Sequence, residues 1–136
     1  MLVSRIMRQP VMTVSMDTSI RAAAALMKGF DIGVLPVCDD ENLVGIITDR
    51  DIVLRWVPHL TDDNPVKTIM TRHVVTCRTA HTIEQAARFM ADMQIRQLVV
   101  KDEAGRIAGI VTLGDIANDA SEEIAGQILG EIVEKR

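Results

Sequence analysis

The sequence predicts a mixed α/β fold, α+β in organisation, built from two β-α-β-β-α repeats. The main observation behind this prediction is an internal duplication. An offset of 63 positions aligns the two copies as far as Asp39 and Asp102, and from Gly45 and Gly109 onward the offset is 64. One extra residue in the second copy is typical of a difference in hairpin-loop length. The matching pairs include Ile6 and Ile69, Val11 and Val74, Thr13 and Thr76, Ile20 and Ile83, Leu35 and Leu98, and Thr48 and Thr112.

The composition favours a globular protein. Apolar residues make up 48% and charged residues 25% of the 136 residues, so the chain has ample material for a core and no bias toward disorder. This length suits one compact domain or two small lobes fused through a shared core. Two repeats of this size are not expected to fold apart from each other.

Several classes of partner are disfavoured by composition. The net charge is −4 without a basic run, and Phe30, Phe89 and Trp56 are the only aromatic residues, so the chain lacks the basic groove and stacking rings that single-stranded nucleic acid needs. The longest apolar stretches, such as residues 22–27, are far shorter than the ~20 residues of a membrane span, and no secretory segment is found. We expect a soluble, cytoplasmic protein that binds neither nucleic acid nor membrane.

A helix is predicted in each copy by apolar residues that recur at helical spacing. The two stripes contain the same residue types, at Ile20, Ala23, Ala24 and Met27 and at Ile83, Ala86, Ala87 and Met90. Ser19 and Thr82 lie at the N-cap positions, and Gln85 completes a capping box in the second copy. The small alanines allow a sheet or a second helix to approach closely.

Strands are predicted on both sides of each helix. Short strands precede the helices at residues 12–15 and 74–77, and hairpins follow them at residues 34–38 and 43–48 and at residues 98–101 and 106–112. The loops inside both hairpins are polar, which suits tight turns. A second helix is expected to begin just after Thr48 and just after Thr112.

These elements divide the chain into four segments. They are the first repeat at residues 1–57, a linker at 58–65, the second repeat at 66–120 and a C-terminal helix at 121–136. Pro58 and Pro65 make the linker typical of a surface connection. Ile124, Ile128 and Ile132 recur at four-residue steps, which predicts that the last segment is an amphipathic helix.

Both copies end their last strand with Gly-x-x-Thr-x-x-Asp, at residues 45–51 and 109–115. One interpretation is a helix cap, in which the threonine hydroxyl accepts from a backbone N–H and the acid favours the positive end of the helix. The other is a nucleotide site, because a helix that starts at a strand end offers N–H donors to a phosphate and a carboxylate can accept from both ribose hydroxyls. The two roles are compatible.

The order of these motifs resembles the cystathionine-β-synthase (CBS) domain over nearly the whole chain, from Val3 to about Ala120. The motifs that carry the resemblance are the leading Ile-Met, the Thr-Val strand, Leu-Pro-Val at residues 35–37 and Thr-Asp-Arg-Asp-Ile at residues 48–52. The resemblance implies a tandem CBS-domain pair, or Bateman module, with a pseudo-twofold axis and two clefts between the repeats. In the family those clefts bind adenosyl ligands such as AMP, ADP, ATP or S-adenosylmethionine. It also suggests a homodimer that meets through its helices.

The resemblance further implies which residues bind the ligand. Asp51 and Asp115 would hold the ribose hydroxyls, and Thr48 and Thr112 would contact the ribose or the phosphate. The strand with Ile32, Val34 and Pro36 would line the adenine. The edge of the base would be contacted by Thr13, Val14, Thr76 and Cys77. The near absence of aromatic residues fits an adenine that lies between aliphatic side chains.

The two copies differ between the threonine and the last aspartate of the motif. The first copy has Asp49 and Arg50, and the second has Leu113 and Gly114. We hypothesise that the site with Arg50 binds the phosphorylated ligand more tightly, helped by Arg96 of the other repeat, since arginine suits bidentate phosphate contacts. Both arginines could equally be solvated surface residues.

No catalytic constellation appears in the sequence, because the histidines lack ligand spacing and no serine lies in a nucleophile elbow. We therefore expect no enzymatic activity and no required cofactor.

The leading prediction is a stand-alone regulatory module that reports adenine nucleotide or S-adenosylmethionine levels to a separate, unidentified protein. The alternative is a structural or oligomerisation module without ligand. Ile52, Leu54 and Ile116 are candidates for a dimer surface or for ordinary core.

The two cysteines, Cys38 and Cys77, lack CxxC or Cys/His spacing. We expect both to be buried strand thiols. A redox or metal sensor is the third interpretation of the chain, and only their presence supports it.

Overall fold

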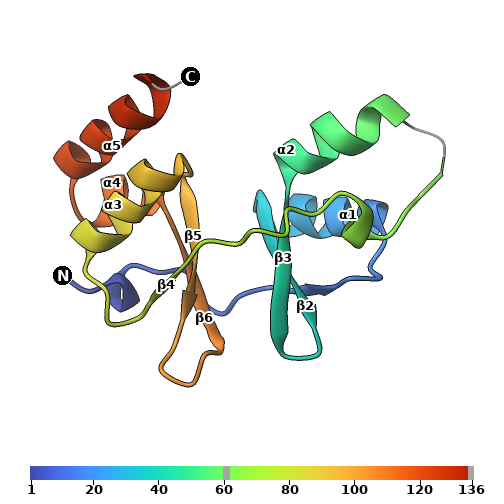
Figure 1. Ribbon diagram of the computed structural model, residues 1–136, viewed down its shortest axis with the longest axis horizontal. Coiled ribbons are helices and arrows are strands. Elements are labelled where there is room, and N and C mark those ends of the chain that lie inside the picture. The colour runs from blue at the N-terminus through green and yellow to red at the C-terminus, as the bar shows by residue number, and fades with distance from the viewer. Residues whose placement is uncertain (60–61, 135–136) are drawn as a thin grey trace. The chain divides into compact units, whose positions relative to one another are not determined.

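The computed structural model describes residues 1–59 and 62–134, and the chain divides into two compact units. Unit 1 comprises Met1–Val11 and Val75–Arg136, and unit 2 comprises Met12–Val74. Each unit contains one three-stranded sheet (Figure 1). The elements follow the predicted order in both units, so the mixed α/β fold with two β-α-β-β-α halves is confirmed.

Unit 2 begins with strand β1 (Val14–Ser15), which is followed by helix α1 (Ile20–Phe30) and by a hairpin of β2 (Val34–Asp39) and β3 (Asn42–Thr48). β1 pairs parallel with β2, and β2 pairs antiparallel with β3. β1 is two residues shorter than predicted, because only these two residues pair with β2.

The chain after β3 differs from the single regular helix that the sequence predicts. Helix α2 (Asp49–Asp51) continues into a π-helical turn (Ile52–Trp56) and a 3-10 turn (Val57–His59). Pro58 cannot supply the N–H that a longer α-helix would need there. The described residues of the predicted linker, 58–59 and 62–65, are exposed except for the half-buried Pro65, and residues 60–61 lie outside the described residues.

Unit 1 repeats this order and adds one helix. Its elements are β4 (Thr76–Arg78), α3 (Ile83–Met93), β5 (Gln97–Lys101), β6 (Ile107–Thr112), α4 (Leu113–Asp119) and α5 (Glu122–Glu134). β4 pairs parallel with β5, and β5 pairs antiparallel with β6. α5 is the predicted amphipathic helix, and its Ile128 and Ile132 are buried in the core of the unit.

The first helix of each unit begins where its N-cap predicts. The Ser19 hydroxyl accepts from the Ala22 N–H at 3.0 Å, and Thr82 and Gln85 form the predicted capping box at the start of α3. Because these caps satisfy N–H groups that the helix itself leaves without partners, they determine where each helix starts.

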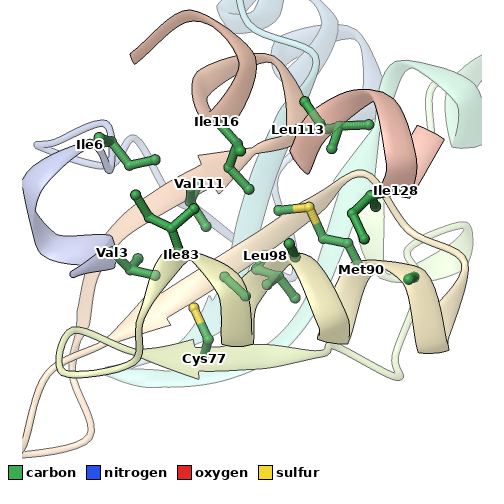
Figure 2. Close-up of a cluster of buried hydrophobic side chains, with 14 of the residues drawn as sticks. Val3, Ile6, Cys77, Ile83, Met90, Leu98, Val111, Leu113, Ile116 and Ile128 are labelled. Atoms are coloured by element: carbon green, nitrogen blue, oxygen red, sulfur yellow. The ribbon is translucent and has the colours of Figure 1, made fainter. Parts of the chain in front are cut away.

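The core of unit 1 is drawn in Figure 2. Side chains from the N-terminal segment, from the strands and from α3, α4 and α5 point toward one another. The labelled residues are Val3, Ile6, Cys77, Ile83, Met90, Leu98, Val111, Leu113, Ile116 and Ile128. Unit 2 has its own core, in which Ile20, Leu35 and Ile47 are fully buried. Each unit therefore has a hydrophobic core of its own. Burial of each such side chain stabilises the folded state by about 1.5–3 kcal/mol.

Each unit also contains the segment that leads along the chain into the other unit. Residues 1–11 lie in unit 1, where Arg8 forms an antiparallel bridge with Ile110 of β6. Residues 65–74 lie in unit 2, where Thr71 forms the equivalent bridge with Ile46 of β3. We call these the leading segments. The compact units therefore have other boundaries than the sequence repeats.

The glycine that opens each Gly-x-x-Thr-x-x-Asp motif makes room for a leading segment. A Cβ atom at Gly45 would lie 2.9 Å from the carbonyl oxygen of Thr71, and one at Gly109 would lie 2.9 Å from that of Arg8. Only a residue without Cβ allows the backbones to approach this closely. The close approach at Gly45 thus brings Thr71 next to Asp51, and the one at Gly109 brings Arg8 next to Asp115.

Candidate functional site

Both Thr-x-x-Asp motifs form capping boxes. The Thr48 hydroxyl accepts from the Asp51 N–H at 3.1 Å, and Asp51 Oδ2 accepts from the Thr48 N–H at 3.0 Å. Thr112 and Asp115 make the same two bonds, both at 3.0 Å. The capping interpretation of the motif is therefore confirmed, and each aspartate keeps one further oxygen, Oδ1, for other partners.

The second oxygen of each aspartate faces the leading segment of its unit. In unit 1, Arg8 Nε donates to Asp115 Oδ1 at 2.9 Å. In unit 2, the Thr71 hydroxyl donates to Asp51 Oδ1 at 3.2 Å, and Arg55 Nη1 lies 3.8 Å from the same oxygen. Asp51 and Asp115 are the buried charged residues of the described chain, at 6% and 3% exposure, so these donors compensate carboxylates that have lost most of their water.

The two sites obtain their arginine from different places. Arg8 and Thr71 are related by the offset of 63, and Arg55 and Asp119 by the offset of 64. Unit 1 therefore has arginine in the leading segment and an acid after the motif, whereas unit 2 has threonine in the leading segment and arginine one turn after its aspartate. Sequence reasoning missed Arg8, Arg55 and Thr71, because none belongs to the motif.

The N–H groups at the start of α2 already have acceptors. Asp49 N–H donates to the carbonyl of Gly33 at 3.0 Å, and Arg50 N–H donates to the Asp49 carboxylate at 2.8 Å. The Asp51 N–H donates to Thr48. The expectation that this helix start offers N–H donors to a phosphate is wrong for α2, because side chains and the preceding loop have taken them.

The start of α4 is arranged in nearly the same way. Leu113 N–H donates to the Arg96 carbonyl at 2.8 Å, and Asp115 N–H donates to the Thr112 hydroxyl. Gly114 N–H has no hydrogen-bond acceptor among the described residues. The difference from α2 arises because Leu113 has no carboxylate to turn back onto the backbone.

The other predicted ligand contacts differ in how accessible they are. Ile32 and Thr76 are half-buried and Thr13 is exposed, so their side chains are available to a ligand. The remaining four are buried: Val14, Val34, Pro36 and Cys77. Because the side chains of Val14 and Cys77 lie in the cores of their units, only their backbone groups are available to a ligand.

Both cysteines are free thiols. Cys77 is 1% exposed, and burial raises its pKa to about 11, as expected when an anion would lose its water. Cys38 is only half-buried, which corrects the prediction for this residue, and burial also raises its pKa. No group of three or more metal-ligating side chains occurs within residues 1–59 and 62–134.

A pocket of about 570 Å³ opens beside the motif of unit 1. It is lined by Arg96, Gln97, Thr112, Leu113, Gly114, Ala117, Glu122, Ala125, Gly126 and Leu129. The small residues of α4 and α5 leave the space, and Arg96 and Glu122 supply opposite charges. The structure thus places Arg96 beside Thr112 of its own repeat. No sequence signal indicated that α5 forms one wall of this pocket.

The sequence matches a known family twice. Residues 3–57 and residues 66–122 each match the CBS domain. The CBS domain-containing protein YhcV of Bacillus subtilis (strain 168) is 40% identical over 128 residues, which cover 93% of this chain and 91% of YhcV. None of the described helices is long and apolar enough to cross a membrane.

Solved structures agree with the sequence match. TA0289, a conserved CBS domain protein of unknown function from Thermoplasma acidophilum, matches with a TM-score of 0.84 at 27% identity, over 96% of this chain and 75% of TA0289. The CBS domain pair of protein MJ0100, in complex with 5'-methylthioadenosine and S-adenosyl-L-methionine, matches with a TM-score of 0.79 at 32% identity, over 93% and 98% of the two chains. With both repeats matched, this chain belongs to the CBS-domain family, as a CBS domain pair.

Proposed function

We propose that this protein is a regulatory module that binds adenosyl ligands at the Asp51 and Asp115 motifs. The observation that carries the proposal is the duplicated buried aspartate, each with one oxygen in the capping box and the other held by replaceable donors. A ribose diol can donate to such an oxygen in place of Thr71 or Arg8. The ligands of the related MJ0100 pair, 5'-methylthioadenosine and S-adenosyl-L-methionine, both contain this diol.

The regulatory step follows from the position of the leading segments. A ligand at Asp115 acts on the donor Arg8, and the segment that contains Arg8 runs directly into unit 2 at Met12. A ligand at Asp51 acts in the same way on Thr71, whose segment enters unit 1 at Val75. A ligand that binds one arrangement of these segments better shifts the population toward it, and a separate partner protein would detect that arrangement.

The proposal gives the chain no catalytic role of its own, since both aspartates serve as caps and the ligand is bound rather than converted. It also assigns the protein to the cytoplasm, because Cys38 and Cys77 are free thiols, as is usual in a reducing compartment.

A thermal-shift experiment tests ligand binding. AMP, ADP, ATP, 5'-methylthioadenosine and S-adenosylmethionine are added one at a time, and a ligand present at a hundred times its Kd stabilises the native state by about 2.7 kcal/mol. Asp51→Asn and Asp115→Asn should each reduce the shift, because asparagine keeps a capping oxygen but loses the charge. Glu41→Gln, in the exposed loop between β2 and β3, is the control. If no ligand moves the midpoint, the regulatory proposal is wrong.

An oligomerisation module is the second candidate, and an exposed apolar surface on the helical turns after β3 supports it. Val53, Leu54 and Val57 are 57%, 56% and 43% exposed. Ile52 and Ile116, the other predicted dimer candidates, are buried at 9% and 0% and belong to the cores. The family resemblance favours a homodimer that uses this surface. Light scattering should show a dimer that Leu54→Glu dissociates, and a dimer with no ligand response would favour this candidate.

A further inference from the structure

We propose that Arg8 makes the Asp115 site select adenosyl ligands that carry a phosphate, and that the Asp51 site lacks this selection. The proposal rests on the adenosyl-binding function proposed above. It adds a specificity-determining residue that lies outside the Thr-x-x-Asp motif and that the second leading segment lacks.

The geometry of Arg8 leaves it able to bind a second anion. Its Nε donates to Asp115 Oδ1 at 2.9 Å, and its side chain is 64% exposed while that of Asp115 is 5% exposed. The two Nη groups have no hydrogen-bond acceptor within the described part of the chain. A ribose that donates to Asp115 would lie beside this planar guanidinium. A phosphate on the same sugar could then accept two parallel hydrogen bonds from the Nη groups.

The neighbours of Arg8 in unit 1 do not oppose such a contact. Leu113 and Gly114, between the threonine and the aspartate of the motif, carry no charge. Arg96 and Glu122, which carry opposite charges, both line the pocket beside the motif. The selection is therefore assigned to Arg8.

Unit 2 differs at each of these points. Thr71 replaces Arg8, and its hydroxyl carries no charge for a phosphate. The arginine whose guanidinium approaches the Asp51 carboxylate is Arg55, and its Nη1 donates to the Ile69 carbonyl at 3.0 Å and is thus partly used. The exposed carboxylate of Asp49 holds the Arg50 N–H and would repel a phosphate at this helix start. This is the reverse of the preference that Arg50 suggested from the sequence.

Calorimetric titration with adenosine and with AMP tests the proposal, because the two ligands differ only in the phosphate. The titrations use the Asp51→Asn background, so that the measured binding comes from the Asp115 site. Arg8→Thr recreates the threonine–aspartate pair that unit 2 already contains, so the variant is expected to fold. It should weaken AMP binding about tenfold, the value of one charge-assisted contact, and change adenosine binding by less than about threefold.

Arg5→Thr is the matched control, since it removes the same charge from an exposed position in the same leading segment. It should leave both affinities unchanged. Equal losses of adenosine and AMP in Arg8→Thr would show that Arg8 acts on the ribose or on folding, and a gain of both would show that it blocks the site. Either result, or no change, overturns the proposal while adenosyl binding stands. If neither ligand binds before Arg8 is changed, the selectivity proposal fails, whereas the proposed function fails only if none of the five thermal-shift ligands stabilises the unmutated protein.

Discussion

Units 1 and 2 differ in how they compensate the same buried carboxylate. Asp115 receives a guanidinium from the leading segment of unit 1, whereas Asp51 receives a hydroxyl from its leading segment and lies near an arginine one turn along its own chain. The capping box is the same in both. A buried carboxylate needs a nearby cation or donor, but any neighbouring element can supply it. The two repeats therefore keep the same buried aspartate but differ in the side chain that compensates its charge.

The equivalence of the two leading segments can be tested by adding a single methyl group, and this test has the largest expected effect. Gly45→Ala and Gly109→Ala should each lower the free energy of unfolding by about 2 kcal/mol, because the new Cβ would meet a backbone oxygen that cannot move easily. Gly29→Ala is the control, since a Cβ there would meet no atom within 4 Å beyond its own stretch of helix α1, and alanine favours a helix. Urea unfolding measures all three. A large loss in only one of the two would show that the crossings are not equivalent.

At alkaline pH, the cysteine of unit 1 should cost the protein more stability than the cysteine of unit 2. The pKa of Cys77 is raised from 9.0 to about 11 by burial, so the native state holds the thiol proton more tightly than the unfolded chain does. The resulting stability is complete below pH 9 and is lost as the pH rises through 11, by about 2 kcal/mol. Cys77→Ala should remove that part of the alkaline loss, and Cys38→Ala should remove less because Cys38 is half-buried. Unfolding measured between pH 8 and pH 11 checks this. Equal effects of the two variants would contradict it.

The capping boxes are predicted to be worth the same in both units. Thr48→Ala and Thr112→Ala each remove an acceptor for a helix N–H and should each cost about 1 kcal/mol of stability. Thr13→Ala, at an exposed position without a side-chain hydrogen bond in the described chain, serves as control. Chemical denaturation decides between equal and unequal losses. A much smaller loss for Thr48 would indicate that the π-helical turn after α2 compensates for the cap.

The ion pair of Arg8 should contribute least to stability. Its guanidinium is 64% exposed, so water and salt screen it, and Arg8→Thr should cost less than about 1 kcal/mol. The loss should shrink at high salt, because the Debye length falls. Denaturation at low and high salt measures it, with Arg5→Thr as control. A loss of several kcal/mol that does not depend on salt would mean that the pair is structural and would argue against a role in ligand selection.

The local elements were predictable because each leaves a signal over a few neighbouring residues. The stripe from Ile20 to Met27 and the cap at Ser19 indicated α1, and Thr82 with Gln85 indicated the start of α3. Of the candidate site, the two capping boxes followed from the Thr-x-x-Asp spacing. The π-helical turn after Asp51 had no such signal, since its apolar pattern is also that of an ordinary helix.

The partners of the aspartates could not be read in this way. Arg8 is 107 residues from Asp115, and Thr71 is 20 residues from Asp51. No periodic pattern connects positions so far apart. The wall that α5 adds beside Thr112 had no sequence signal either, because its lining residues are ordinary small residues of an amphipathic helix.

The order of elements, the helix starts and the repeat of the aspartate therefore follow from residues within about one turn of each other, where the backbone's own hydrogen bonds decide. Which segment crosses Gly45 or Gly109, and hence whether a threonine or an arginine meets the buried carboxylate, depends on how the chain packs. That choice is made by long-range burial, because apolar contacts are not directional and a linear pattern does not specify their partners. The difference between the two sites arises there.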